Sequence, residues 1–299
     1  MKREVNLALG GGGVRGVAHL GVVQCLLDHD YKINGISGTS AGGLFGATIA
    51  AGNTPRDVAA AVDKFFNESS FRSGISISTA SFSLIGTNGM IKALEPFLQG
   101  KKMEDLQIPF VATAVSLKNG QEIIIKDGDV MQAVLATIAI PGFFPSQGDQ
   151  VLVDGGILDP VPIDSAREFD TSLPIVAVLL HKRPQDFSLD NIKVPFEDSL
   201  IEPLAKTISK TRIGELMRHL TATVDVVSSK LSELRIEKSK PDVLVEPVVG
   251  HIGLLQKIEA QPLFDEGYRA MEENLENLEK AYSLVNSFRR ITKYAHSQD

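Results

Sequence analysis

The chain has 299 residues, 43% of them hydrophobic and 22% charged, a composition typical of a soluble globular protein that buries a large core. Its formal net charge of −7 excludes a general nucleic-acid binder, because such a protein needs a basic surface. The single cysteine, Cys25, excludes a disulfide framework within the chain and is read as a small buried apolar side chain. The sequence has no signal-peptide pattern and no long uncharged apolar stretch, so we expect a cytoplasmic protein that touches membranes only transiently.

Apolar runs and turn residues predict strands and helices that alternate along the first part of the chain. Strands are expected, in order, at 5–9, 33–37, 108–117, 122–126, 151–153 and 173–180. Helices are expected between them at 17–28, at 41–51, from the cap Thr54 to Phe66, and from the cap Asp129 to a point before Pro141. Farther along, 188–240 is expected to be mostly helical, 243–245 to be a strand and 262–288 to be one long helix.

This alternation predicts an α/β fold, in which a mostly parallel central sheet carries helices on both faces. We treat 1–299 as a single domain, with the motifs within 5–180 and a mainly helical extension with one further strand at 181–299. Sites in such folds gather at the carboxyl ends of the strands, so the turns that follow the strands are the first place to search.

Two segments carry no clear assignment to core structure. Residues 67–89 are rich in Ser, Gly, Thr and Asn with scattered apolar side chains, which favours either a substrate-facing lid or a plain surface loop. Residues 289–293 are largely basic. They are interpreted as a solvated terminus, with a contact to anionic lipid as the alternative.

The segment Gly38-Thr39-Ser40-Ala41-Gly42 has the Gly-x-Ser-x-Gly pattern of a nucleophile elbow, a sharp strand-to-helix turn that presents a serine. Glycines relieve the crowding of such a turn because they have no Cβ. The strand expected before it, and the small apolar helix after it that stops at Gly52, fit this geometry. Ser40 is therefore the candidate nucleophile, and it needs a base and a set of oxyanion donors.

A run of glycines at 10–13, continued by Val14-Arg15-Gly16, lies between the first strand and its helix. Consecutive glycines leave backbone N–H groups uncrowded, so they can converge on a phosphate or on the oxyanion of an acyl intermediate. Gly11-x-Gly13-x-x-Gly16 also matches a dinucleotide fingerprint. However, no carboxylate ends the second strand to hold a ribose, and no Gly-Lys-Ser/Thr completes a P-loop, so the oxyanion interpretation is favoured.

The turn Asp154-Gly155-Gly156 follows a predicted strand, which puts a carboxylate at the sheet edge with little steric cover. Asp154 is the candidate base, and a plain Asp-Gly turn is the alternative. A catalytic triad would add a histidine after the acid. The downstream histidines are His181, His219, His251 and His296, none of them in a recognisable motif, and His181 is the best placed because it follows a strand. His19, on the helix after the glycines, is expected to pack or to orient that turn.

Taken together and in this order, the glycine loop with Arg15, the Ser40 elbow and the Asp154 turn resemble the patatin-like phospholipase family. The resemblance covers residues 5–180. It includes the segment Ala139-Ile140-Pro141-Gly142-Phe143-Phe144-Pro145 ahead of the strand that leads to the acid. Each motif alone is common, and their combination is specific.

The resemblance implies a Ser–Asp dyad with no catalytic histidine, no metal and no other cofactor. Ser40 would be the nucleophile and Asp154 the base. The N–H groups of Gly11, Gly12 and Gly13 would form the oxyanion hole, Gly16 would support the loop, and Arg15 would orient it or meet a lipid phosphate. The implied activity is hydrolysis of fatty acyl esters of phospholipids, lysophospholipids or related lipids. The alternative is a lipid- or anion-binding regulatory module with the same fold and little catalysis.

Overall fold

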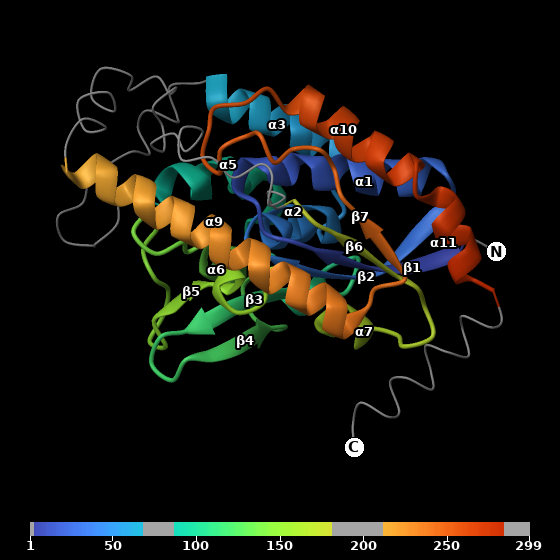
Figure 1. The fold of residues 1–299 in the computed structure, drawn as a ribbon, viewed down its shortest axis with the longest axis horizontal. Coiled ribbons are helices and arrows are strands. Elements are labelled where there is room, and N and C mark those ends of the chain that lie inside the picture. The colour runs from blue at the N-terminus through green and yellow to red at the C-terminus, as the bar shows by residue number, and fades with distance from the viewer. Residues whose placement is uncertain (1–2, 68–86, 181–211, 284–299) are drawn as a thin grey trace.

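The computed structural model describes residues 3–67, 87–180 and 212–283 (Figure 1). Its strands are β1 (Arg3–Leu9), β2 (Tyr31–Thr39), β3 (Phe110–Ser116), β4 (Gln121–Ile125), β5 (Leu152–Asp154), β6 (Ile175–Val178) and β7 (Val243–Val245). Its α-helices are α1 (Val17–Asp28), α2 (Ala41–Ala50), α3 (Pro55–Asn67), α5 (Asn88–Leu98), α6 (Val130–Thr137), α7 (Ile163–Arg167), α9 (Arg212–Ser239), α10 (Ala260–Glu272) and α11 (Leu275–Ala281). Within the described ranges, every helix is too short or too polar to serve as a membrane span.

The strands form one sheet in the order β4-β3-β2-β1-β6-β7, with β5 paired to β3. The pairs among β3, β2, β1, β6 and β7 are parallel, and only β4 and β5 run antiparallel to β3. The expected mostly parallel α/β sheet is therefore confirmed.

Both faces of the sheet are covered by helices, as the side chains of β1 demonstrate. Val5, Leu7 and Leu9 belong to the large core that includes residues of α1 and α10, whereas Ala8 points into a second core with residues of α7. Successive residues of a strand point to opposite faces, so a strand buried on both faces reads as a continuous apolar run. Figure 1 shows α1, α3 and α10 gathered along one side of the sheet and α7 and α9 along the other.

The pairing of β3 explains how the chain brings two distant turns together. β4 pairs with residues 112–116 along one edge of β3, and β2 pairs with residues 110–113 along the other. β5 pairs with residues 114–116, beyond the point where the pairing with β2 ends. It therefore lies on the same edge of β3 as β2. The carboxyl ends of β2 and β5 therefore face each other, and Ser40 and Asp154 lie at this junction.

Three expectations differ from the structure. No element was expected at α5 or α7; α5 contains Pro96, which reads as a helix breaker. The expected long helix at 262–288 is wrong in its described part, because α10 ends at Glu272 and α11 begins at Leu275. The side chain of Asn274 donates to the carbonyl of Ala270 at 2.9 Å and thereby ends α10.

Several expectations fall on residues outside the described ranges. They include the body of the proposed lid at 68–86, the helical part at 188–211, the basic residues 289–293 and the histidines at 181 and 296. The helix start at Asn88 shows that the irregular segment ends before residue 89.

Helices α1 and α10 pack through two glycines, and this contact can be tested. A Cβ on Gly267 would lie 1.9 Å from the carbonyl oxygen of Ala18. Alanine is intrinsically the better helix residue, so a loss of stability in Gly267→Ala would measure the clash. We expect the free energy of unfolding in urea to fall by about 1–3 kcal/mol. Glu272→Ala, an exposed change on the same helix, should stay within about 0.5 kcal/mol of the parent; an equal effect of both changes would contradict the close packing.

Candidate active site

Ser40 lies in a strained turn between β2 and α2. Its backbone angles are φ 53° and ψ −120°, which a residue with a side chain rarely adopts. The turn is tight enough that a Cβ on Gly38 would lie 2.4 Å from the carbonyl oxygen of Gly42. A Cβ on Gly42 would lie 2.0 Å from that of Leu9. The glycines of the elbow are thus required by close backbone contacts, and the turn holds the Ser40 side chain in one place.

Thr137, at the end of α6, supports this turn and was not singled out by the sequence. Its hydroxyl accepts a hydrogen bond from the backbone N–H of Ser40 at 2.9 Å and donates to the carbonyl of Thr113 at 2.6 Å. The N–H of Ser40 is therefore occupied by a protein group. Because this partner is a single threonine far along the chain, no local pattern could have identified it.

The glycine loop offers fewer oxyanion donors than the sequence suggested. The N–H of Gly11 donates to the carbonyl of Pro160 at 2.9 Å, so the expectation that Gly11 contributes a free donor is corrected. The contacts of the described residues assign no acceptor to the N–H groups of Gly12 and Gly13. Gly11 instead abuts the nucleophile, since a Cβ added there would lie 3.3 Å from the Cβ of Ser40.

Arg15 is fully buried and fixes the loop from behind. Its Nε donates to the carbonyl of Ile252 at 2.6 Å and its Nη1 to that of Leu180 at 3.5 Å. Its Nη2 lies 3.6 Å from the carboxylate of Asp225 on α9. These contacts agree with the expected orienting role and leave no exposed guanidinium to meet a lipid phosphate.

Gly16 and His19 support the same loop. A Cβ on Gly16 would lie 2.6 Å from the Cβ of Ala41, so the glycine lets the start of α1 pack against the elbow helix. The Nε2 of His19 lies 2.8 Å from the carbonyl oxygen of Gly10. Burial lowers the pKa of His19 to about 4, which the bond to Gly10 only partly opposes, so the imidazole is neutral near pH 7 and Nε2 donates. The expectation that His19 orients this turn agrees with the bond.

Asp154 ends β5 with its carboxyl group buried beside Ser40; each residue is 6% exposed. Oδ1 accepts a hydrogen bond from the N–H of Gly156 at 2.8 Å. Burial raises the pKa of Asp154 to about 6, and the Ser40 hydroxyl and the Gly156 N–H partly oppose this effect. The Ser40 hydroxyl is thus near enough to act on the carboxyl group. The contact falls short of standard hydrogen-bond geometry, and Oδ2 is buried without a hydrogen-bond partner.

Two cavities meet at Ser40. The larger one, about 140 Å³, is lined almost entirely by apolar side chains from several helices, among them Phe45, Phe65 and Leu94. The smaller one, about 70 Å³, is lined by Ser40, Asp154, the glycine loop and residues of α9. A group attacked by the Ser40 hydroxyl would therefore lie between an apolar cavity and a second, mainly apolar cavity that also carries the polar side chains of Asp154, Asp225 and Ser228.

The described histidines do not line the cavity that holds the dyad. His219 and His251 are exposed, and neither they nor His19 line the cavity that holds Ser40 and Asp154. Within the described ranges, no group of three His, Cys, Asp or Glu side chains is placed to hold a metal ion. Ser40, Asp154 and the glycine loop line one cavity.

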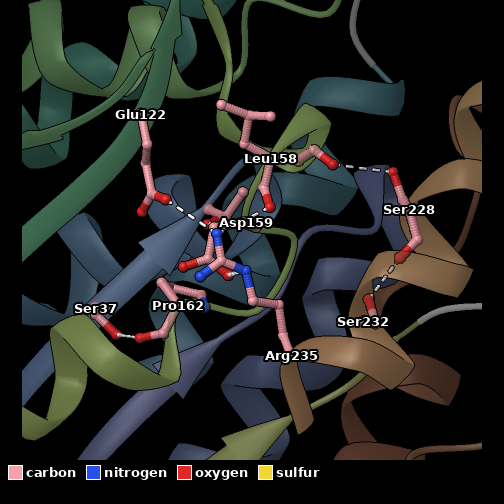
Figure 2. A network of polar contacts seen from close by, with 10 residues as sticks. Ser37, Glu122, Leu158, Asp159, Pro162, Ser228, Ser232 and Arg235 are labelled. Atoms are coloured by element: carbon pink, nitrogen blue, oxygen red, sulfur yellow. Dashed lines mark hydrogen bonds and ion pairs between the residues drawn. The ribbon is translucent and has the colours of Figure 1, made fainter. Parts of the chain in front are cut away.

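Helix α9 is the part of the site that the sequence did not identify. Figure 2 shows how it is attached to the segment after Asp154. Arg235 donates to Glu122 and to the carbonyl of Leu158, both at 3.1 Å, and its Nε lies 3.5 Å from the Asp159 carboxylate. Burial raises the pKa of Asp159, and Arg235 opposes this rise. Ser228 donates to the carbonyl of Gly156 at 3.2 Å and so ties the helix to the acid turn itself.

Comparison with known proteins adds to this geometry. A model of the family described as patatin-like phospholipase matches residues 7–167. An uncharacterized NTE family protein of Mycobacterium tuberculosis is 34% identical over 178 residues, which are 59% of this chain and 49% of that protein. Another from the same organism is 29% identical over 283 residues, covering 87% of this chain and 47% of that protein. The chain thus spans about half the length of these relatives.

Two further similarities are more distant. Lysophospholipase NTE1 of Cryptococcus neoformans is 27% identical over 170 residues, covering 56% of this chain and 10% of that protein. The crystal structure of VipD from Legionella pneumophila is similar with a TM-score of 0.45 and 12% identity, covering 92% of this chain and 67% of that chain.

The support that Thr137 gives to the elbow can be measured. Thr137→Val keeps the shape of the side chain and removes the acceptor for the Ser40 N–H, leaving a buried donor unpaired. We expect the free energy of unfolding to fall by about 1–3 kcal/mol. Thr137→Ser keeps the hydroxyl and should lose less. Equal losses in the two variants, measured by urea denaturation, would show that the methyl group rather than the hydrogen bond matters.

Proposed function

Because this chain belongs to the patatin-like phospholipase family, whose model matches residues 7–167, we propose that it is a lipid acyl hydrolase that cleaves fatty acyl esters through Ser40 and Asp154. The observation that carries the proposal is the junction of β2 and β5. It brings the strained serine and the buried carboxyl group to one cavity beside the N–H groups of Gly12 and Gly13. A relative named as a lysophospholipase supports a lipid substrate.

In the first step, Oγ of Ser40 attacks the ester carbonyl carbon while Asp154 takes the hydroxyl proton. The N–H groups of Gly12 and Gly13 donate to the oxyanion that forms, and such donors are each worth about 2.7–4 kcal/mol in comparable sites. The bond to the alcohol then breaks, and Asp154 returns the proton to the alcohol oxygen. The products of this step are the free alcohol and an acyl ester of Ser40.

In the second step, Asp154 takes a proton from water, and the resulting hydroxide oxygen attacks the acyl carbon. Collapse of the intermediate releases the fatty acid, and the proton held by Asp154 returns to Oγ of Ser40. A carboxylate with an ordinary pKa near 3.9 is a weak base for these transfers. Burial raises the pKa of Asp154 to about 6, which makes it a better base near neutral pH.

The apolar cavity suits the acyl chain. It is lined by Phe45, Phe65, Phe97 and other apolar side chains, and Ser40 lies on its wall. Apolar surface removed from water contributes about 25 cal/mol per Å², so a fatty acyl chain gains binding energy there that a short acid does not.

Removal of either dyad residue should abolish hydrolysis. For Ser40→Ala and Asp154→Asn, we expect kcat/KM on a nitrophenyl fatty ester to fall about a thousandfold or more, because one group is the nucleophile and the other its base. Circular dichroism should show an unchanged fold. Full activity in either variant would refute the dyad.

A fluorophosphonate probe tests the binding-module alternative in the same preparation. An enzyme of the proposed kind is labelled at Ser40 and loses labelling in Ser40→Ala, whereas a module that only binds lipid is not labelled.

The pH dependence of the rate should follow Asp154. Only the ionised carboxylate accepts the Ser40 proton, and its pKa is about 6. We therefore expect kcat/KM to be constant above that value and to fall about tenfold per pH unit below it. Circular dichroism across the same range would exclude unfolding as the cause. A rate that keeps its full value down to pH 4 would contradict Asp154 as the base.

A further inference from the structure

Helix α9 buries a set of polar side chains, while its apolar Val224, Leu231 and Ile236 are only half-buried. Its buried residues with described side chains are all polar, namely Thr221, Asp225, Ser228, Ser229 and Ser232. Its large exposed apolar side chains are Leu216, Leu220, Val226, Val227 and Leu234. A helix that packs on a protein core normally buries its apolar stripe. The inward face of α9 therefore combines core packing, as at Ile236, with fully buried polar groups that core packing alone does not require.

Part of this inward face lines the cavity that contains the dyad. Asp225 and Ser228 line the cavity of about 70 Å³ together with Ser40 and Asp154. They lie three residues apart and so share one side of the helix. The apolar cavity also has Ser40 on its wall, and no described residue of α9 lines it. The two halves of an ester at Ser40 thus meet different linings, and α9 faces the half that is not the acyl chain.

The position of these two side chains is fixed by their contacts. The Ser228 hydroxyl donates to the carbonyl of Gly156, two residues after Asp154. The Asp225 carboxylate pairs with the buried guanidinium of Arg15 at 3.6 Å. Arg235 holds the same helix to the carbonyl of Leu158 (Figure 2). The residues that follow Asp154 therefore hold the side of α9 that carries Asp225 and Ser228 at a fixed distance from the dyad.

The chemistry of these groups defines the partner. A carboxylate only accepts hydrogen bonds, and a hydroxyl whose proton is given to Gly156 is left with acceptor lone pairs. Both therefore fit a ligand that donates, such as an alcohol with free hydroxyl groups.

We propose that Asp225 and Ser228 form the subsite for the alcohol half of the substrate, and that this subsite selects esters whose alcohol carries a free hydroxyl group next to the scissile ester. The proposal rests on the proposed hydrolase function and adds a substrate class to it. The hydroxyl of the alcohol half donates to the Asp225 carboxylate and to Oγ of Ser228 while Ser40 attacks the carbonyl.

The test compares two esters of one fatty acid, glycerol monooleate and ethyl oleate. The intact protein should hydrolyse glycerol monooleate with the higher kcat/KM. A hydrogen bond to a charged acceptor is worth more than one to a neutral acceptor. We therefore expect the ratio of kcat/KM for the two esters to fall about tenfold in Asp225→Asn and about threefold in Ser228→Ala, with a smaller loss on ethyl oleate than on glycerol monooleate.

Outward-facing changes on the same helix serve as controls. Glu233→Gln and Thr223→Ala alter exposed residues of matched type and should leave the ratio unchanged. Oleoyl lysophosphatidylcholine carries the same free hydroxyl. A greater loss on it than on glycerol monooleate would identify the phosphodiester-bearing lipid as the one whose hydroxyl binds here.

Two results would overturn the proposal. An unchanged ratio in both variants would mean that neither side chain touches the alcohol. An equal loss on both esters would mean that Asp225 and Ser228 only hold Arg15 and the acid turn in place. If the intact protein hydrolyses no ester at all, the proposed function itself fails, and this result is distinct from a lost selectivity.

Discussion

Two backbone carbonyl groups hold the site together. The carbonyl of Asp159 accepts a hydrogen bond from the Thr39 hydroxyl at 2.8 Å, and that of Pro160 accepts one from the N–H of Gly11 at 2.9 Å. Both belong to the segment that begins with Asp154. The same short segment thus supplies the carboxyl group, fixes the residue before the nucleophile and fixes the start of the glycine loop. Buried polar groups of this kind are costly to leave unpaired, so the three pieces are held in one arrangement.

The sheet supplies the second constraint. Ser40 and Asp154 meet because β5 runs antiparallel along the edge of β3 that β2 leaves free. A shift of β5 by one residue would turn every side chain of this strand to the opposite face. The pairing of Asp154 with Ala114 therefore decides on which face the carboxyl group lies. The site lowers the stability of the fold locally, because Ser40 has a strained backbone and because the carboxyl group of Asp154 is buried, which raises its pKa.

Local patterns predicted much of the fold and the turns of the candidate site. The Ser40 elbow, the glycine loop and the Asp154 turn each have a short-range signature, because steric crowding in a tight turn dictates glycine at nearby positions. Contacts between distant segments had no such signature. The carbonyl of Pro160 occupies the N–H of Gly11, and Thr137 occupies that of Ser40, through pairings that only the folded sheet creates. A helix was expected within 188–240, but its role at the site was missed, because no local pattern marks Asp225 and Ser228 as lining the cavity that contains Ser40.

The two cavities that meet at Ser40 impose an order in time on the proposed reaction. The alcohol leaves first, while the acyl group remains bonded to the serine within apolar walls. The vacated space, about 70 Å³, has room for more than one water molecule, and Asp154 lies on its wall. Water thus reaches the acyl-enzyme from the side of Asp154, and the acyl chain of the intermediate stays in the apolar cavity, away from water. An alcohol product that stays in this space would block the entry of water. Slow release of the alcohol would therefore delay release of the fatty acid.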